Sequence, residues 1–153
     1  MKTRLLVLSI LCSLFLITND VLPQVAKPLE IDARHEIVYK DPIKGLNSAD
    51  ADIRLDCAFV LGELKCQKAA ISLMRLLRED PSEAVRIVAA ESLIKIDDPV
   101  GVYLVNRTAK FNEFEHVRKL CEKFYNSYVY EQLTAAHPDA SKEEILAAMA
   151  TKK

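Results

Sequence analysis

The stretch Ala84 to Ile96, AVRIVAAESLIKI, decides the architecture of this chain because its pattern occurs three times. The Val85-Arg86 pair lies 32 residues after Ile53-Arg54 and 32 residues before Val117-Arg118. Small residues share the column four positions further on: Cys57, Ala89 and Cys121. A fixed period of this length predicts a solenoid of stacked helical units and not a single closed core.

The composition is that of a packed domain of ordinary size. Of the 153 residues, 50% are hydrophobic and only 3 are glycine. The formal net charge is −1, whereas a nucleic-acid-binding domain usually carries a clear positive excess. Composition therefore argues against nucleic acid as a partner.

Residues 1–26 are expected to form a targeting segment. Lys2 and Arg4 make a charged start, and Leu5 to Ile17 contains only Ser and Cys besides aliphatic and Phe residues. That run is 13 residues long, shorter than the ~20 residues with which a helix crosses a bilayer. It matches the apolar region of a secretory signal, with cleavage expected after Ala26. Export to the periplasm or the medium is therefore expected, and anchoring to a membrane by an uncleaved segment is the alternative.

Behind this segment the chain is expected to fall into three parts. Residues 27–40 predict an extended lead-in, residues 41–132 carry the repeats, and residues 133–153 predict a linker and a C-terminal helix. Apolar residues at helical spacing and restarts at Asp-Pro predict the individual helices. They are expected at Asp41–Leu46, Ala51–Lys65, Gln67–Arg78, Pro81–Ile96, Pro99–Phe111 and Glu113–Tyr130, followed by a short helix that opens on the capping-box signature Ser141–Glu144.

The same spacing assigns roles to single side chains. Leu64 and Ile71 are expected on the buried faces of their helices. Asp80 is expected to cap the helix that starts at Pro81, and Glu83 can close a capping box there.

The last part of the chain is rich in aromatic residues, of which Phe111 is the first. They are expected to close the last repeat against the terminal helix, which would bury Ile145, Leu146 and Met149. A ligand pocket lined by these aromatic residues is the alternative. Such a short helix would be marginal in isolation.

The cysteines behind the targeting segment are expected to be free, although a disulfide between Cys57 and Cys66 is conceivable at the cost of strain in a helix–turn junction. Cys57 and Cys121 hold equivalent positions two repeats apart, roughly 20 Å at a helix spacing of ~10 Å. A disulfide needs Cα atoms within ~7 Å. Cys57 and Cys121 are therefore expected to be buried thiols, and Cys66 a more exposed one.

The repeat resembles the HEAT repeat, and more narrowly the short-period variety described in phycobilin lyases. The resemblance rests on Asp80–Arg86, Val88–Leu93 and Ile53-Arg54 with Leu61–Leu64, and it covers about Asp41–Tyr130. It implies an all-α, right-handed α-solenoid of about three helix pairs with a short C-terminal capping helix. The first helices would lie on the convex side and the second helices would line the concave side. The resemblance implies protein interaction far more often than catalysis.

The arginine column (Arg54, Arg86, Arg118) is the most regular polar feature of the sequence. In the family that the chain resembles, such arginines bond to acidic residues and carbonyls of neighbouring turns. Asp80 is the one clear acidic turn partner, and its equivalents are Ser48 and Asn112. A structural ladder is the favoured interpretation, and an anion site is the alternative.

No catalytic or metal-binding pattern stands out in the sequence. HEAT-like iron enzymes use several His-Glu pairs, whereas this chain has one, His35-Glu36, and a reversed Glu115-His116. A metal site needs several ligands that converge on one point. No metal, cofactor or catalytic residue is therefore predicted.

A strip on the outward side of the second helices is the predicted partner-binding surface. Helical geometry at 100° per residue places these apolar residues on it: Leu55, Phe59, Ile87 and Ile94. Gly62 is expected on the same side, and Lys119 and Lys123 continue it as a basic end that would steer acidic residues of a partner. The alternative is that residues 27–46 of the chain cover the strip.

The function predicted from these features is that of an exported, non-catalytic module for protein–protein interaction or scaffolding, with a protein partner. An accessory protein or ligand-binding relative of the lyase-type HEAT proteins is one alternative. A purely structural subunit of an envelope assembly is another.

Overall fold

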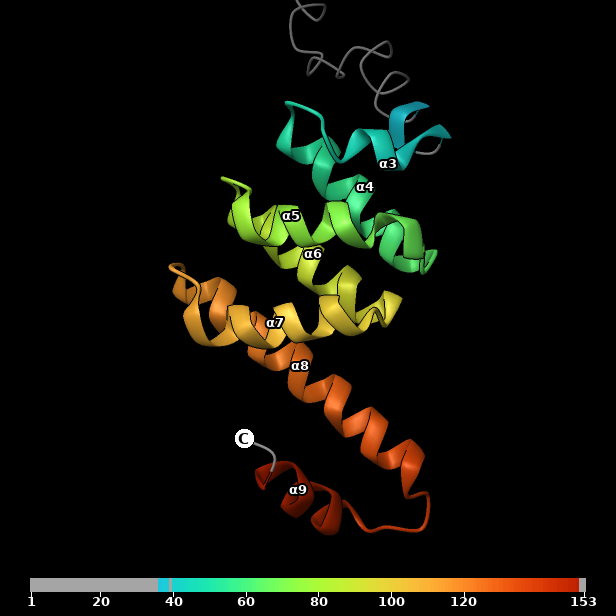
Figure 1. Cartoon of the computed structure of the whole chain (residues 1–153), viewed down its shortest axis with the longest axis vertical. Helices are drawn as coiled ribbons and strands as arrows, with labels where there is room; N and C mark the ends of the chain where they lie inside the picture. Colours follow the sequence, from blue (N-terminus) through green and yellow to red (C-terminus); the bar gives the residue numbers. More distant parts are fainter. Residues whose placement is uncertain (1–35, 39, 152–153) are drawn as a thin grey trace, which may run out of the picture. The chain divides into compact units, whose positions relative to one another are not determined.

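The computed structural model describes residues 36–38 and 40–151, so the predicted targeting segment and most of the lead-in lie outside the described residues. Residues 36–38 and 40 are helical, so the described end of the lead-in is not extended as predicted. The described part is helical and holds no strand. Its elements in chain order are α3 (Pro42–Gly45), α4 (Ala51–Glu63), the 3₁₀ turn η1 (Gln67–Ala69), α5 (Ala70–Glu79), α6 (Glu83–Ile96), α7 (Pro99–Phe111), α8 (Glu115–Ala136) and α9 (Lys142–Ala150) (Figure 1). The predicted all-α solenoid is confirmed.

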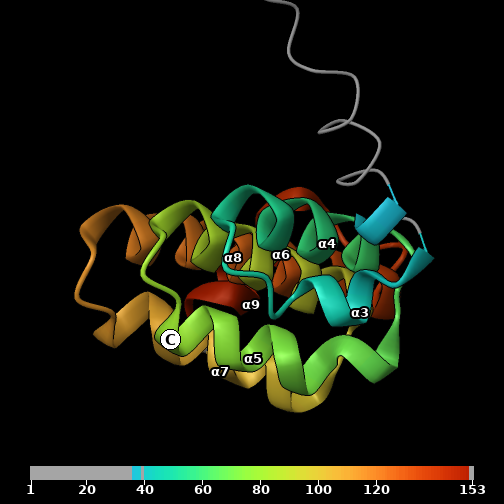
Figure 2. The ribbon, with the colours of Figure 1, turned by 90° about the horizontal axis from the view of Figure 1, so that it is seen from above.

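The helices form two layers that follow the repeat. The first helices α3, α5 and α7 lie on one side, and the second helices α4, α6 and α8 lie on the other (Figure 2). Each first helix packs on the second helix that follows it, and α6 packs on both α4 and α8. We call these sides the first-helix layer and the second-helix layer.

The core runs along the stack between the two layers. The small-residue column of Cys57, Ala89 and Cys121 is fully buried, because at these points successive second helices lie close together. Leu61 and Leu93, one turn further along α4 and α6, are buried in the same core. The period of the sequence is therefore also the period of the core.

The contact between α4 and α6 corrects the predicted place of Gly62. It does not face outward but lies buried against Ser92, and a Cβ atom at Gly62 would stand 2.5 Å from Ser92 Oγ and 2.8 Å from Ser92 Cα. Ser92 Oγ in turn donates a hydrogen bond of 2.8 Å to the carbonyl of Ala58. The absence of a side chain at Gly62 lets the two helices approach closely.

Two predicted core residues are exposed. Leu64 is the C-cap of α4, since the helix ends at Glu63 and Lys65 turns the chain with a φ of 48°. Ile71 lies in the first turn of α5 with 78% of its surface accessible. Its neighbours Ala70 and Leu73 face the core instead.

The start of α6 differs from the prediction. It begins at Glu83 and not at Pro81, and Ser82 occupies the N-cap position without a capping side-chain hydrogen bond. Asp80 ends α5 as its C-cap, and its carboxylate accepts from the Ser82 N–H at 2.9 Å. The predicted capping role fails because α6 begins at Glu83, so that Asp80 lies two residues before the N-cap.

The C-terminal part is a helical hairpin of α8 and α9. α8 begins two residues later than predicted and runs six residues further, to Ala136. It ends there because the next residue, His137, precedes Pro138, and a residue before proline disfavours helical backbone. The predicted capping box of Ser141 and Glu144 starts α9. Ile145 is buried as predicted, whereas Leu146 is half exposed. None of the described helices has the length and apolar character that crossing a membrane requires.

Candidate functional site

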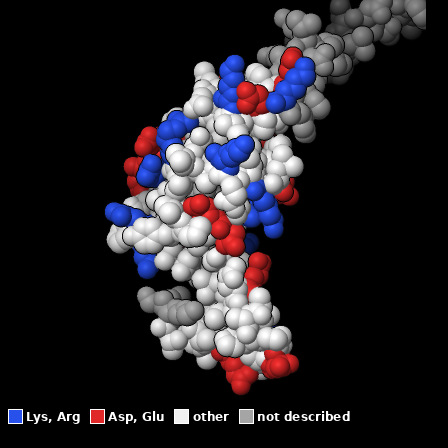
Figure 3. Space-filling view, turned by 45° about the vertical axis from the view of Figure 1, so that its right-hand side comes forward, with Lys and Arg blue, Asp and Glu red and all other residues white. Residues whose placement is uncertain are grey.

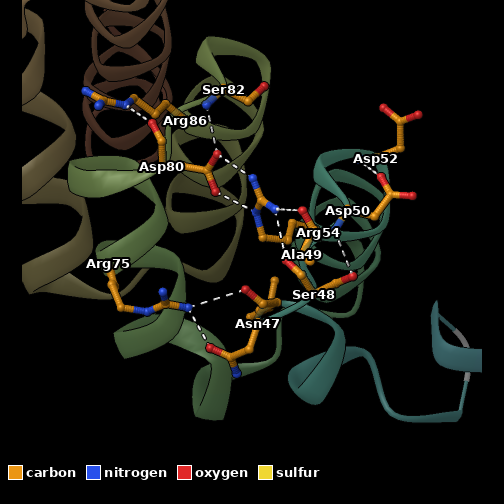
Figure 4. A network of polar contacts seen from close by, with 11 residues as sticks. Asn47, Ser48, Ala49, Asp50, Asp52, Arg54, Arg75, Asp80, Ser82 and Arg86 are labelled. Atoms are coloured by element: carbon orange, nitrogen blue, oxygen red, sulfur yellow. Dashed lines mark hydrogen bonds and ion pairs between the residues drawn. The ribbon is translucent and has the colours of Figure 1, made fainter.

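The turns between helices are joined by a buried ion pair (Figure 4). Arg54 in α4 donates from Nε to Asp80 Oδ2 at 2.7 Å and from Nη2 to Asp80 Oδ1 at 2.9 Å. Its Nη1 donates to the carbonyls of Ser48 and Ala49 at 2.9 and 3.0 Å. The side chains of Arg54 and Asp80 are only 10% and 2% exposed. The pair therefore ties the turn before α4 to the turn before α6.

The other two arginines of the column repeat part of this geometry. Arg86 Nε donates to the carbonyl of Asp80 at 2.6 Å, and Arg118 Nη1 donates to the carbonyl of Asn112 at 2.7 Å. Each arginine thus reaches the carbonyl six residues before it, as Arg54 does with Ser48. Arg86 also pairs with Glu113 Oε1 at 2.9 Å. In all three repeats the arginine bonds to the turn just before its own helix. In the first two repeats it also pairs with an acidic residue of the turn in the next repeat.

A second periodic contact lies in the turns themselves. Ser48, Asp80 and Asn112 each accept with their side-chain oxygen from the backbone N–H two residues on, at 3.2, 2.9 and 3.0 Å. Such side-chain turns satisfy backbone donors just before a helix. The equivalence of these positions in the sequence reflects this shared contact.

The electrostatics of the pair favour its charged form. Burial alone would raise the pKa of Asp80, but the hydrogen bonds from Arg54 and the Ser82 N–H and the charges of Arg54 and Arg86 lower it below the ordinary 3.8. The hydrogen bond to Asp80 raises the pKa of Arg54. The contacts commit the Arg54 guanidinium to the protein itself, so it is not open to an external anion.

The predicted apolar strip is not a continuous exposed surface. Phe59 is 48% exposed, whereas the other three members are half-buried and pack against the core: Leu55, Ile87 and Ile94. This corrects the helical-wheel expectation, because neighbouring second helices approach closely enough to cover one another's flanks. The partner-binding role of these residues stays a prediction, with Phe59 as its one exposed apolar anchor.

Ion pairs surround Phe59 on this layer. Lys95 Nζ lies 5.3 Å from the Phe59 ring centroid and pairs with Glu63 at 2.6 Å and Glu91 at 2.7 Å. Of the two predicted steering residues, Lys119 pairs with Glu115 at 2.7 Å, and Lys123 is exposed. The face drawn in Figure 3 likewise shows basic and acidic side chains interspersed, with acidic ones near the C-terminal hairpin.

The first-helix layer holds a groove that the sequence analysis did not predict. It lies between α5 and α7, has a volume of about 470 Å³, and is lined by Met74, Val100, Tyr103, Leu104 and Phe111 together with Arg78, Arg107, Thr108 and Asn112. We call it the α5–α7 groove. Tyr103 and Phe111 on its rim are 62% and 77% exposed. This corrects the expectation that Phe111 closes the last repeat.

Part of this surface could be read from the sequence. Ile71 and Tyr103 lie 32 residues apart, so the same outward column is apolar in two successive repeats. Tyr103 lines the groove, whereas Ile71 is exposed on the same layer outside its lining. Arg78 and Arg107 have no acidic residue four positions before or after them, which is a spacing at which ion pairs form along a helix.

Cysteines and possible metal ligands are the other side chains that could carry chemistry. Cys57 and Cys121 are buried, Cys66 is partly buried, and all three are free. Burial raises the pKa of Cys57 to about 11, with further contributions from the charges of Asp56 and Asp41, and burial raises that of Cys121 to about 12. Within residues 36–38 and 40–151, no group of His, Cys, Asp or Glu side chains is placed to hold a metal ion.

Comparison with known proteins identifies the repeat. No curated protein matches the chain. The family model described as HEAT repeats matches residues 40–120, which is more than half of the 153 residues. The match spans α3 to the first part of α8, the region in which the arginine column and the paired layers repeat. The chain therefore belongs to the HEAT-repeat family.

Proposed function

We propose that this chain is an exported, non-catalytic module that holds a protein partner against its first-helix layer. HEAT repeats form helical scaffolds and commonly mediate protein–protein interactions. One observation carries the choice of surface: Ile71, Tyr103 and Phe111 expose 78%, 62% and 77% of their surface on adjacent first helices. Single exposed apolar residues need no explanation, but several of them on one layer are typical of an interaction site.

A non-catalytic role agrees with the chemistry of the described side chains. The nucleophilic form of cysteine is the thiolate, and the raised pKa values of Cys57 and Cys121 keep both thiols protonated near neutral pH. The arginine column is bonded to turn carbonyls and carboxylates. These groups support the fold and not a reaction.

Export is supported by the sequence of residues 1–26. A charged start and a short apolar run are typical of a secretory signal. Cell fractionation with intact-mass analysis of the purified protein tests it. A mature chain beginning at Lys27 in the exported fraction is expected, and a chain retaining residues 1–26 in the cytosol would contradict export.

Affinity purification of the tagged full-length protein tests the interaction. The wild type is compared with Ile71→Lys/Tyr103→Lys and with Phe59→Lys, after circular dichroism has shown that both variants are folded. All three substituted side chains are exposed, so the fold is expected to tolerate the changes. We expect one partner that wild type and Phe59→Lys retain and that the double variant loses.

Two other outcomes would contradict the proposal. Loss of the partner only in Phe59→Lys would assign the interaction to the second-helix layer, where the sequence predicted the apolar strip. If wild type captures no partner under conditions in which the protein is abundant and folded, the interaction function itself fails.

A further inference from the structure

The α5–α7 groove has the dimensions of a site for a short segment of chain. On α7 its lining residues recur at i, i+4, i+7 and i+11: Val100, Leu104, Arg107 and Phe111. At 1.5 Å per residue, this face is about 16 Å long. That length accepts about five extended residues at ~3.3 Å each or about three helical turns at 5.4 Å.

The lining of the groove combines apolar and basic side chains. Val100, Tyr103 and Leu104 line it along the first part of α7, and Arg78 and Arg107 line it further along, beside Phe111. No acidic residue is among the described side chains that line it. A segment that fits this lining must therefore carry apolar and acidic residues next to each other.

The first helices also carry an excess of positive charge outside the groove. From Gln67 to Glu79 and from Pro99 to Phe111 the only acidic residue is Glu79, against five basic ones: Lys68, Arg75, Arg78, Arg107 and Lys110. The second helices α4 and α6 have the opposite balance, with the three basic residues Arg54, Arg86 and Lys95 against five acidic ones. The two layers thus differ in sign although the whole chain is nearly neutral.

The two arginines of the groove are uncommitted. Within residues 36–38 and 40–151, neither Arg78 nor Arg107 makes a hydrogen bond or an ion pair, and both are exposed. This separates them from Arg54 and Arg86, which the turns hold. A guanidinium with free donors binds a carboxylate in bidentate geometry.

From these observations we infer that the α5–α7 groove binds an acidic, apolar-anchored segment of a partner protein. The inference rests on the proposed function and adds the chemistry of the partner. An aliphatic or aromatic side chain of the segment lies against Val100, Tyr103 and Leu104. Neighbouring Asp or Glu residues pair with Arg78 and Arg107.

A structural role of the arginines makes a different prediction. Arg78 lies in the last turn of α5, where a positive charge interacts favourably with the helix dipole. If that were its whole role, its replacement would lower the thermal stability and leave binding unchanged. Arg107 lies one turn before the end of α7, where the dipole effect is weak.

The test is a selection of short random peptides displayed on phage, with the full-length protein as the target. Peptides that combine Asp or Glu with an adjacent aromatic or aliphatic residue are expected to be enriched. One enriched peptide, synthesised with a fluorophore, then serves as the probe in fluorescence anisotropy. Its affinity is expected to fall as sodium chloride is added, because exposed charge pairs are screened.

Three variants locate the site. Arg78→Glu/Arg107→Glu is expected to weaken binding of the probe tenfold or more. Arg78→Gln/Arg107→Gln, which removes the positive charge without adding a negative one, is expected to weaken it by a smaller factor. Lys119→Glu/Lys123→Glu carries the same change in net charge on α8 and is expected to leave the affinity unchanged. Circular dichroism and thermal unfolding confirm that each variant is folded before binding is compared.

Four results would overturn the inference. The first is that the selection enriches peptides without acidic residues, and the second is that the arginine variants bind the probe as tightly as wild type. The third is that only the α8 control loses binding of the probe. The fourth is that the wild type associates with itself and the arginine variants do not. The last would make the groove an interface between two copies of the chain. If the partner found by affinity purification stays bound to Arg78→Glu/Arg107→Glu, only this inference fails and the interaction function stands.

Discussion

Removal of the Asp80 carboxylate tests whether the arginine column holds the repeats together. In Asp80→Ala, Arg54 Nε and Nη2 lose acceptors at 2.7 and 2.9 Å, and the Ser82 N–H loses one at 2.9 Å. Arg54 keeps its contacts to two turn carbonyls but becomes an unpaired charge with a side chain only 10% exposed. Breaking a buried pair in this way costs about 3–5 kcal/mol.

Such a loss is large against the roughly 5–15 kcal/mol of a typical domain. Urea unfolding followed by far-ultraviolet circular dichroism measures it, with linear extrapolation to water. The matched control is Asn112→Ala, which removes a side chain from the same column. Among the described residues, the Asn112 side chain bonds only to the Phe114 N–H, while the carbonyl that Arg118 contacts belongs to the backbone and stays in the variant. Loss of such a side-chain hydrogen bond costs about 1 kcal/mol.

The comparison of the two variants decides the question. Asp80→Asn should fall between them, because its amide oxygen keeps one acceptor. The reasoning is refuted if Asp80→Ala costs no more than Asn112→Ala. In that case the carboxylate would only be a helix-end cap, and the contact between the turns would add nothing measurable.

The pKa of Asp80, the close contact at Gly62 and the burial of Cys57 can each be tested separately. Because the fold lowers the pKa of Asp80, the stabilisation from this carboxylate is present above pH 3.8, its ordinary pKa, and is lost as the pH falls below that value. The difference in the free energy of unfolding between wild type and Asp80→Asn should therefore shrink from pH 6 to about pH 3 in urea titrations. A difference that stays constant would contradict this. Gly62→Ala should lower the free energy of unfolding by about 1–3 kcal/mol in the same assay, although alanine is the better helix former. The reason is that the new Cβ would lie 2.5 Å from the Ser92 side chain and 2.8 Å from the Ser92 backbone. A gain in stability would show that α4 and α6 are not in close contact. Thiol labelling of the native protein, mapped by mass spectrometry, should modify Cys66 far faster than the fully buried Cys57, whose pKa is about 11. Equal labelling rates of the two cysteines would contradict the core packing.

The period and the core columns could be read from the sequence because they depend on local spacing. A residue every three or four positions sets the buried face of a helix, and the offset of 32 sets the stacking. The family resemblance added the pairing of helices, and the fold confirms it. Pro99–Phe111 was predicted to the residue because Asp98 caps it and Pro99 opens it.

The errors arise where a distant residue decides. Asp80 has the local appearance of an N-cap, but its partner Arg54 lies 26 residues earlier. Gly62 was placed outward because a helical wheel does not show how closely the next helix approaches. Distances between neighbouring helices are a tertiary property that spacing along one helix does not encode.

The groove was missed for a related reason. Its two sides come from α5 and α7, and its apolar lining is split between helices that each look complete alone. Ile71 was assigned to the core because apolar residues of a helix are buried by default, although the face that contains Leu73, Leu76 and Leu77 already fills that role. Comparison of equivalent columns across repeats would have shown Ile71 and Tyr103 as a shared outward pair.

The central claim is that a partner binds to the first-helix layer, and site-specific photocrosslinking in the producing cells tests it most directly. A benzophenone amino acid replaces Tyr103 in one variant and Phe59 in the other; both natural side chains are exposed aromatics, at 62% and 48%, on opposite layers. We predict that a partner protein crosslinks at position 103 and that the crosslinked peptide carries acidic residues, with no such product at position 59. Crosslinks at position 59 alone, or at neither position, would contradict the account.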